Sequence, residues 1–141
     1  MAEQQLKQRP VYRNIHISQI VGYRLPPAGM VSILHRVSGA LMFLLMPFII
    51  WMFDTSLTSE ISYGTFTSLF NAGLGPLPGW MFKLVVLALI WGFVHHFIAG
   101  VRHLWMDATH AVGKSFGQQS AVVTLGLGVL LTLLLGAKLF F

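Results

Sequence analysis

The residues best suited to chemistry in this sequence lie near the end of an apolar stretch, in the segment HHFIAGVRHLWMD. His96 and His103 are seven residues apart, so a helix places them on one face, with Ala99 and Gly100 between them. Such small residues would let a planar macrocycle lie against the backbone, and imidazole is a common metal ligand. His95 points about 100° away from His96 and cannot serve the same iron. This face therefore predicts a site for an iron-bearing macrocycle.

Both histidines also have simpler explanations. His103 could be an imidazole at the membrane interface, since Arg102 and Asp107 are close to it in the sequence. His96 lies deeper in the apolar run and could be a hydrogen bonder between two helices. The residues alone leave these alternatives open.

A second polar group occurs earlier, where Ser32, His35, Arg36 and Gly39 are spaced to share one face of a helix. This face carries a hydroxyl, an imidazole and a guanidinium, followed by a gap at the glycine that a flat ligand could approach. Ionisable residues inside a membrane span are costly, so they are a default place to look for function. The alternative is that His35 and Arg36 only contact lipid headgroups.

Three stretches of the sequence are long enough to hold these groups in a membrane, because a spanning helix needs about 20 mainly apolar residues. They are residues 30–53, 79–105 and 121–140. The connection 54–78 is rich in Ser, Thr and Gly and is expected to be a loop. With 55% hydrophobic and 9% charged residues, the 141-residue chain is predicted to be a single all-α membrane domain. Its three transmembrane helices would form a bundle behind a short N-terminal segment in the cytoplasm.

The charges predict the orientation of this bundle. Nine Lys and Arg against four acids give a net charge of +5, which in a membrane chain usually reports topology, and nucleic-acid binding is not expected. Basic residues flank the first span and the second connection, whereas the first connection carries only Asp54 and Glu60. The positive-inside rule then places the N-terminus in the cytoplasm and the C-terminus in the periplasm of a bacterial inner membrane.

The first span runs from the cytoplasmic side into the bilayer, and the second span runs back toward that side. Both polar groups therefore lie in the cytoplasmic half of the bilayer. A quinone head group could bind there, with the macrocycle just beneath it. The chain has no cysteine, so it cannot ligate an iron–sulfur cluster through thiolates. The third span has no histidine, and His35 lies near the interface. A second axial ligand is therefore expected from another membrane subunit.

Several motifs together resemble the cytochrome b556 subunit family of succinate dehydrogenase. They are Arg9-Pro10, Arg24-Leu25-Pro26, SILHRVSG at Ser32 to Gly39, and the pattern HxxxGxRHxxxD from His96 to Asp107. The resemblance covers Arg9 to Asp107 and includes the three-span architecture. It implies a four-subunit complex in which a flavoprotein oxidises succinate, an iron–sulfur subunit carries electrons, and two membrane subunits share haem b and reduce quinone.

The resemblance also implies roles for individual residues. His96 is similar to the axial ligand of the haem iron, and His35 and His103 to partners of the haem propionates. Ser32 and Arg36 are similar to quinone-site residues. Asp107 resembles an acidic residue near the quinone entrance.

Three other functions stay open at this level. The anchor of a quinol:fumarate reductase uses similar parts in the reverse direction. A proton-relay or transport subunit would also place ionisable residues in the membrane, although the acids of this chain lie outside the spans. A purely structural anchor would keep these polar residues for assembly with its partners.

Overall fold

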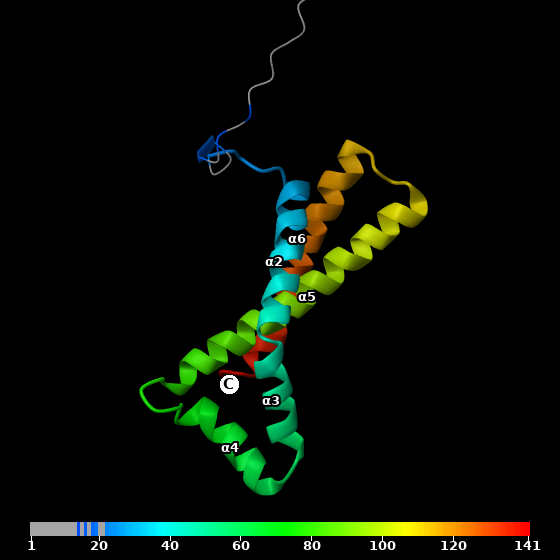
Figure 1. Cartoon of the computed structure of the whole chain (residues 1–141). Coiled ribbons are helices and arrows are strands. Elements are labelled where there is room, and N and C mark those ends of the chain that lie inside the picture. Colours follow the sequence, from blue (N-terminus) through cyan, green and yellow to red (C-terminus); the bar gives the residue numbers. More distant parts are fainter. Residues whose placement is uncertain (1–13, 15, 17, 20–21) are drawn as a thin grey trace, which may run out of the picture.

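The computed structural model describes residues 14, 16, 18–19 and 22–141 (Figure 1). The segment expected on the cytoplasmic side, with Arg9-Pro10, lies mostly outside these residues. From residue 22 onward the chain is helical apart from short connections, and no strand occurs there. Its helices are α2 (Pro27–Leu44), α3 (Met46–Leu57), α4 (Glu60–Asn71), α5 (Gly79–Thr109) and α6 (Lys114–Ala137).

The first predicted span forms two consecutive helices. α2 begins with Pro27, which has a backbone angle suited to a first turn and needs no hydrogen bond there. Pro47 interrupts the helix because it has no N–H to donate to the carbonyl of Phe43. The backbone leaves the helical conformation at Leu45 (φ −89°, ψ 6°), and α3 follows in nearly the same direction (Figure 1). The expected span 30–53 is thus a helix broken near its middle.

The expectation that residues 54–78 form a loop was wrong for most of that connection, because α3 continues to Leu57. The connection also contains α4, whose N-terminus is closed by a capping box. Ser59 Oγ accepts a hydrogen bond from the N–H of Ser62 at 3.1 Å, and Ser62 Oγ accepts from the N–H of Ser59 at 2.9 Å. After α4 the chain turns at Gly73, whose φ of +90° is a conformation that favours glycine. α4 packs against α3 and α5.

The other two predicted spans are single helices with somewhat different ends. α5 begins at Gly79 as expected and continues past Trp105 to Thr109, where His110 adopts a left-handed conformation (φ 54°). α6 begins at Lys114, earlier than expected, and the chain after Ala137 closes in a turn. α2, α5 and α6 are each long and apolar enough to cross a membrane.

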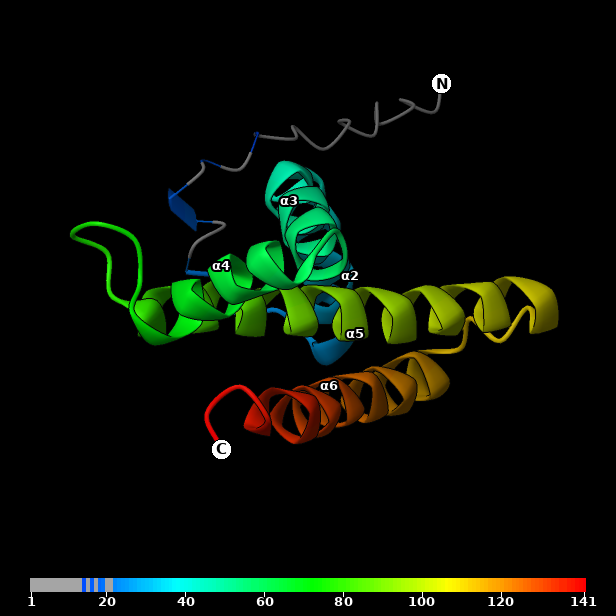
Figure 2. The same ribbon diagram turned by 90° about the horizontal axis from the view of Figure 1, so that it is seen from below.

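These three helices pack against one another, α5 and α6 running side by side while α2 crosses them (Figure 2). Their shared interior consists of the fully buried side chains Val31, Ala99 and Ala121. Large apolar side chains instead cover the outside, as Phe93 and Leu133 do at 64% exposure each. Small residues between helices and large apolar ones outside are typical of a membrane bundle, whose solvent is lipid.

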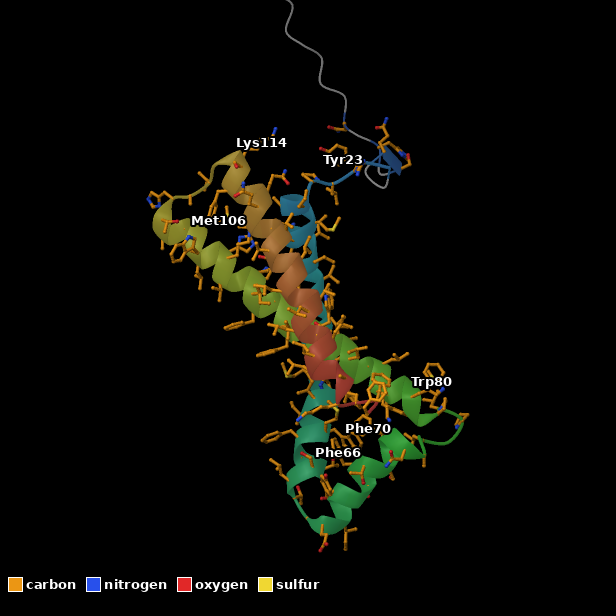
Figure 3. The ribbon with its side chains drawn as sticks, turned by 180° about the vertical axis from the view of Figure 1, so that it is seen from behind. Tyr23, Phe66, Phe70, Trp80, Met106 and Lys114 are labelled. Carbon is orange, nitrogen blue, oxygen red and sulfur yellow. The ribbon has the colours of Figure 1, made fainter. Side chains whose placement is uncertain are left out.

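Aromatic residues mark the two ends of the bundle. Tyr23 lies at the end that contains Lys114, and Trp80 lies toward the opposite end (Figure 3). Tyr and Trp are enriched at both membrane–water interfaces. The arrangement therefore defines a long axis for the molecule, with the start of α2, the end of α5 and the start of α6 at one end.

Candidate functional site

The two polar groups of the sequence meet between α2 and α5. The imidazole of His35 on α2 stacks on that of His96 on α5, with ring centroids 4.0 Å apart and an interplanar angle of 12°. The ring of His103 is tilted by 58° against that of His35, at 5.4 Å between centroids. The antiparallel course of the two helices thus brings both groups to the same end of the bundle, as the sequence predicted.

His96 is held by the backbone of α2. Its Nδ1 lies 3.0 Å from the carbonyl oxygen of His35. A carbonyl oxygen can only accept a hydrogen bond, so Nδ1 must carry the proton and donate. In a neutral imidazole the other nitrogen, Nε2, then keeps an unprotonated lone pair. The contact fixes both the tautomer and the direction of the ring.

Ser38 completes this arrangement, and the sequence did not single it out. Its hydroxyl donates to the carbonyl oxygen of His35 at 2.9 Å, and Ser38 Oγ lies 3.3 Å from Nδ1 of His96. The side chain is fully buried. One carbonyl oxygen and one hydroxyl therefore surround the protonated nitrogen of His96.

Two glycines provide the space for these rings. A Cβ atom placed on Gly39 would come within 2.9 Å of Cε1 of His96, closer than real Cβ contacts. A Cβ on Gly100 would lie 3.7 Å from Nε2 of His35. The ring of His35 thus lies over Gly100, and Ala99 is fully buried in the core with Val31 and Ala121. The expectation that the small-residue face of Ala99 and Gly100 is open to a macrocycle was therefore wrong, because α2 and α6 pack against it. Gly39 is required by the close approach of His96.

His95 faces a different part of the bundle, as its position next to His96 requires. It is 1% exposed, stacks on Trp91 with centroids 5.5 Å apart, and would lie 3.4 Å from a Cβ on Gly128 of α6. Its Nε2 is buried and has no hydrogen-bond partner among the residues that the structure describes. Such tight packing leaves no room for a large ligand, so His95 belongs to the helix interface.

The remaining candidates belong to α2 and α5, the same two helices that carry the histidine cluster. Ser32 is half-buried one turn before Arg36, and Arg36 is exposed. Asp107 is exposed near the end of α5, and its backbone carbonyl oxygen is 2.8 Å from Nδ1 of His110. Neither Arg36 nor Asp107 forms a side-chain hydrogen bond or ion pair within the described part of the chain. Their polar groups are free to meet a ligand.

Arg102 has a structural role that the sequence did not reveal. Its guanidinium donates from Nε to Ser120 Oγ at 2.9 Å and from a terminal nitrogen to the carbonyl oxygen of Gly117 at 3.0 Å. The side chain is only 9% exposed. These bonds join the last third of α5 to the first third of α6.

A comparison with protein families decides the class of the molecule. Residues 5–135 match the model of the succinate dehydrogenase/fumarate reductase transmembrane subunit. The chain belongs to this family. Its apolar helices agree with a transmembrane subunit, and the fold and family are therefore those that the sequence motifs predicted.

Individual members of the family show how far the similarity extends. The succinate dehydrogenase cytochrome b556 subunit of Coxiella burnetii is 33% identical over 85 residues, which cover 60% of this chain and 63% of that protein. The cytochrome b556 subunit of Paracoccus denitrificans is 24% identical over 134 residues, covering 95% of this chain and 94% of that protein. The succinate dehydrogenase cytochrome b560 subunit of Reclinomonas americana is 28% identical over 79% of this chain and 76% of its own length. The match thus spans less than two thirds of the Coxiella subunit and nearly all of the Paracoccus one.

In this chain, the histidine cluster can supply one ligand to a metal ion but not a complete set of ligands. Among the described residues, no group of three or more His, Cys, Asp or Glu side chains is arranged to hold a metal ion. His96 nevertheless offers an oriented lone pair, since a metal-bound histidine usually donates its other ring N–H to a carbonyl or carboxylate. His96 therefore fits an iron that takes most of its ligands from a macrocycle.

Proposed function

We propose that this chain is the haem b- and quinone-binding anchor of a bacterial succinate dehydrogenase, passing electrons from an iron–sulfur subunit to quinone. The observation that carries the proposal is the hydrogen bond from His96 Nδ1 to the carbonyl oxygen of His35, at 3.0 Å. This hydrogen bond leaves the lone pair of Nε2 available to bind haem iron. The cytochrome names of the three relatives support the same cofactor. A bound haem b would accept and release single electrons.

The second axial ligand comes from another membrane subunit in this proposal. Two axial histidines must point their nitrogens at one iron from opposite sides, whereas His35 and His96 face each other with their ring planes, 4.0 Å apart. No iron fits between rings stacked in this way. His95 is enclosed by the helix interface, and α6 contains no histidine. In this proposal, His35 and His103 would donate hydrogen bonds to the haem propionates.

The quinone head group binds beside the cluster, at Ser32, Arg36 and Asp107. Ser32 lies one turn from Arg36, so both can address one ligand. The hydroxyl of Ser32 donates to a quinone carbonyl, and the guanidinium of Arg36 stabilises negative charge that develops on the quinone oxygen. Asp107 lies at the end of the bundle, where the two protons needed for each quinone are taken from water.

We infer the cytoplasmic side from the charges of the described residues. Four basic residues lie in the half of the molecule that contains the histidine cluster, and two lie toward its opposite end. They are Arg24, Arg36, Arg102 and Lys114, against Lys83 and Lys138. The positive-inside rule places the cluster toward the cytoplasm and the end of α6 toward the periplasm. This side also presents the quinone site to a flavoprotein and an iron–sulfur subunit outside the membrane.

Succinate oxidation is proposed over fumarate reduction because the three relatives are succinate dehydrogenase subunits by name.

A proton relay through the bundle is less well supported. The acids Asp54, Glu60 and Asp107 are all exposed and lie toward the ends of the molecule, so the interior of the described helices has no carboxylate. Lipid and partner subunits cover the large apolar side chains outside the bundle.

The test is the visible spectrum of the reduced complex, purified with its partner subunits, for His96→Ala and His95→Ala. His96→Ala should lose the paired bands of low-spin haem b and lower the haem content, whereas His95→Ala should keep the spectrum in the fraction that assembles. His110→Ala, at an exposed position, controls for loss of a histidine. Haem bound to the His96 variant with unchanged affinity and spectrum would overturn the assignment.

A further inference from the structure

A hollow at the other end of the molecule has no part in the histidine site. It has a volume of about 560 Å³ and lies among α3, α4, α5 and the turn after α6. Phe66 and Phe70 of α4 lie on the side of α4 that faces α3 (Figure 3). Two lysines line the same hollow, Lys83 of α5 and Lys138 directly after α6. The hollow therefore combines aromatic walls with two positive charges.

Within the described residues, no acidic side chain neutralises the two ammonium groups. No acidic side chain lines the hollow, and neither lysine forms an ion pair among the residues that the structure describes. Asp54, the acid of α3, does not line the hollow, and its Oδ1 lies 3.2 Å from Oγ1 of Thr58. The Nζ atom of Lys83 lies 5.9 Å from the ring centroid of Phe140, a weak interaction that leaves its donors available.

Neutral hydrogen-bonding groups stand beside these charges. Thr67 and Asn71 of α4 and Ser56 of α3 also line the hollow. A lone lysine near a helix end would extend to the interface for its own solvation. Ser56 and Thr67 already donate their hydroxyl protons to the backbone of their own helices, at 2.9 and 3.0 Å, so two lysines from different helices and the amide of Asn71 are the donors of the hollow. This arrangement is suited to an anionic group with several acceptor oxygens, such as a phosphate.

An apolar groove continues from the hollow toward the middle of the bundle. A second hollow of about 370 Å³ shares Ile49, Met52 and Val86 with the first one. It extends between α3 and α5 to Phe93 and to Leu135 of α6. Its lining is apolar throughout, as a hydrocarbon chain requires. The charged end and the apolar groove are therefore two parts of one elongated depression.

We propose that this depression binds one anionic phospholipid, with its phosphate at Lys83 and Lys138 and an acyl chain along the groove of α3 and α5. The ligand has to be amphiphilic, because the charged end lies near a membrane surface and the groove runs into the hydrocarbon region. Basic pockets between transmembrane helices are known to bind acidic headgroups. A free phosphate would leave the groove empty, and a zwitterionic lipid would leave the excess positive charge uncompensated.

The experiment measures, by native mass spectrometry, which lipids the whole complex retains when it is released from nanodiscs. The nanodiscs consist of phosphatidylcholine with a minority of phosphatidylglycerol. The wild-type chain should retain phosphatidylglycerol selectively. Lys83→Gln and Lys138→Gln should each weaken retention about fivefold, which corresponds to the ~1 kcal/mol contributed by a lysine near an anionic surface. Inorganic phosphate should not displace the bound lipid, because it lacks the acyl chain.

Matched variants separate this site from a general effect of charge. Lys114→Gln removes the same charge at the opposite end of the bundle and should retain the lipid at the wild-type level. Lys83→Arg with Lys138→Arg keeps both charges and should also retain it. Equal retention by the Lys83→Gln/Lys138→Gln chain and the wild type would overturn the proposal, as would equal retention of phosphatidylcholine. A photo-crosslinker at Thr67 that captures a partner polypeptide and no phosphatidylglycerol would show instead that a protein occupies the depression.

Discussion

His96 on α5 donates a hydrogen bond from Nδ1 to the backbone carbonyl oxygen of His35 on α2, at 3.0 Å. The acceptor belongs to the main chain, so its position depends on how the two helices pack and not on a side-chain rotamer. Any change that moves α2 against α5 must therefore change the direction of the proposed haem ligand. This dependence can be tested without altering either histidine.

Gly39→Ala is expected to weaken haem binding while the protein stays folded. The new Cβ would lie 2.9 Å from Cε1 of His96, and the ring cannot yield without lengthening its bond to the carbonyl oxygen of His35. Changes to groups that orient a metal-bound histidine typically cost about 10–100-fold in metal affinity or activity. Haem titration of the purified complex, followed by its visible spectrum, measures the loss.

Gly126→Ala is the matched control, because a Cβ on Gly126 of α6 would meet no atom within 4 Å. Both substitutions exchange glycine for alanine inside a helix and raise helix propensity equally. The control should bind haem as the wild type does. If Gly39→Ala also binds haem with wild-type affinity, the close approach of α2 does not determine the orientation of His96.

Ser38→Ala should have a smaller effect than Gly39→Ala. It removes the buried hydroxyl that contacts His96 Nδ1 at 3.3 Å but leaves the bond to the carbonyl oxygen of His35. A net loss of about 0.5–1.5 kcal/mol is expected, or a decrease in haem affinity of about two- to tenfold. The same haem titration measures it, with Ser115→Ala at an exposed position as control. A Ser38→Ala complex with unchanged affinity would limit the role of Ser38 to packing.

The sequence predicted the parts of this fold that depend on hydrophobicity and helical periodicity. Long apolar stretches identified α5 and α6, and the antiparallel course of the first two spans predicted that the groups around His35 and His96 lie at the same end of the bundle. The divergence of His95 from His96 followed from the 100° step of a helix. None of these features requires knowledge of how one helix is rotated against another.

The missed features depend on contacts between distant residues or on local competition. Ser38 is a small polar residue in a span, and only the rotation of α2 against α5 directs it at His96. Arg102 resembled a flanking charge because its partners Ser120 and Gly117 follow a chain reversal. α4 was hidden by its Ser, Thr and Gly residues, which are weak helix formers, although Ser59 offered a capping signal.

Arg102 and Ser120 should be energetically coupled in a double-mutant cycle. Arg102→Met keeps the length of the side chain and removes its hydrogen bonds to α6, while Ser120→Ala removes one acceptor. Hydrogen bonds that involve a charged group contribute about 1.5–3 kcal/mol, so Arg102→Met should lower the free energy of unfolding by at least this range. Denaturation of the complex in detergent measures each variant. Additive effects of the two substitutions would show that the two residues do not stabilise each other.

The quinone site gives the last prediction, because Ser32 and Arg36 lie one turn apart on α2 and beside the histidine cluster. Ser32→Ala removes one hydrogen-bond donor and should cost about 0.5–1.5 kcal/mol of quinone binding or transition-state stabilisation. Arg36→Leu also removes the charge that stabilises the quinone oxygen, so it should lower quinone reduction further. The measurement is quinone reductase activity of complexes whose assembly has been verified.

Succinate oxidation with a soluble artificial acceptor is the control within each complex. In the proposed assembly this reaction takes place on another subunit, so both variants should keep it at the wild-type level while quinone reduction falls. A parallel loss of both activities would indicate defective assembly and can be recognised from the subunit content. If quinone reduction also stays at the wild-type level in both variants, Ser32 and Arg36 do not form the quinone site. The exposure of Arg36 would then identify the pair as contacts for lipid headgroups.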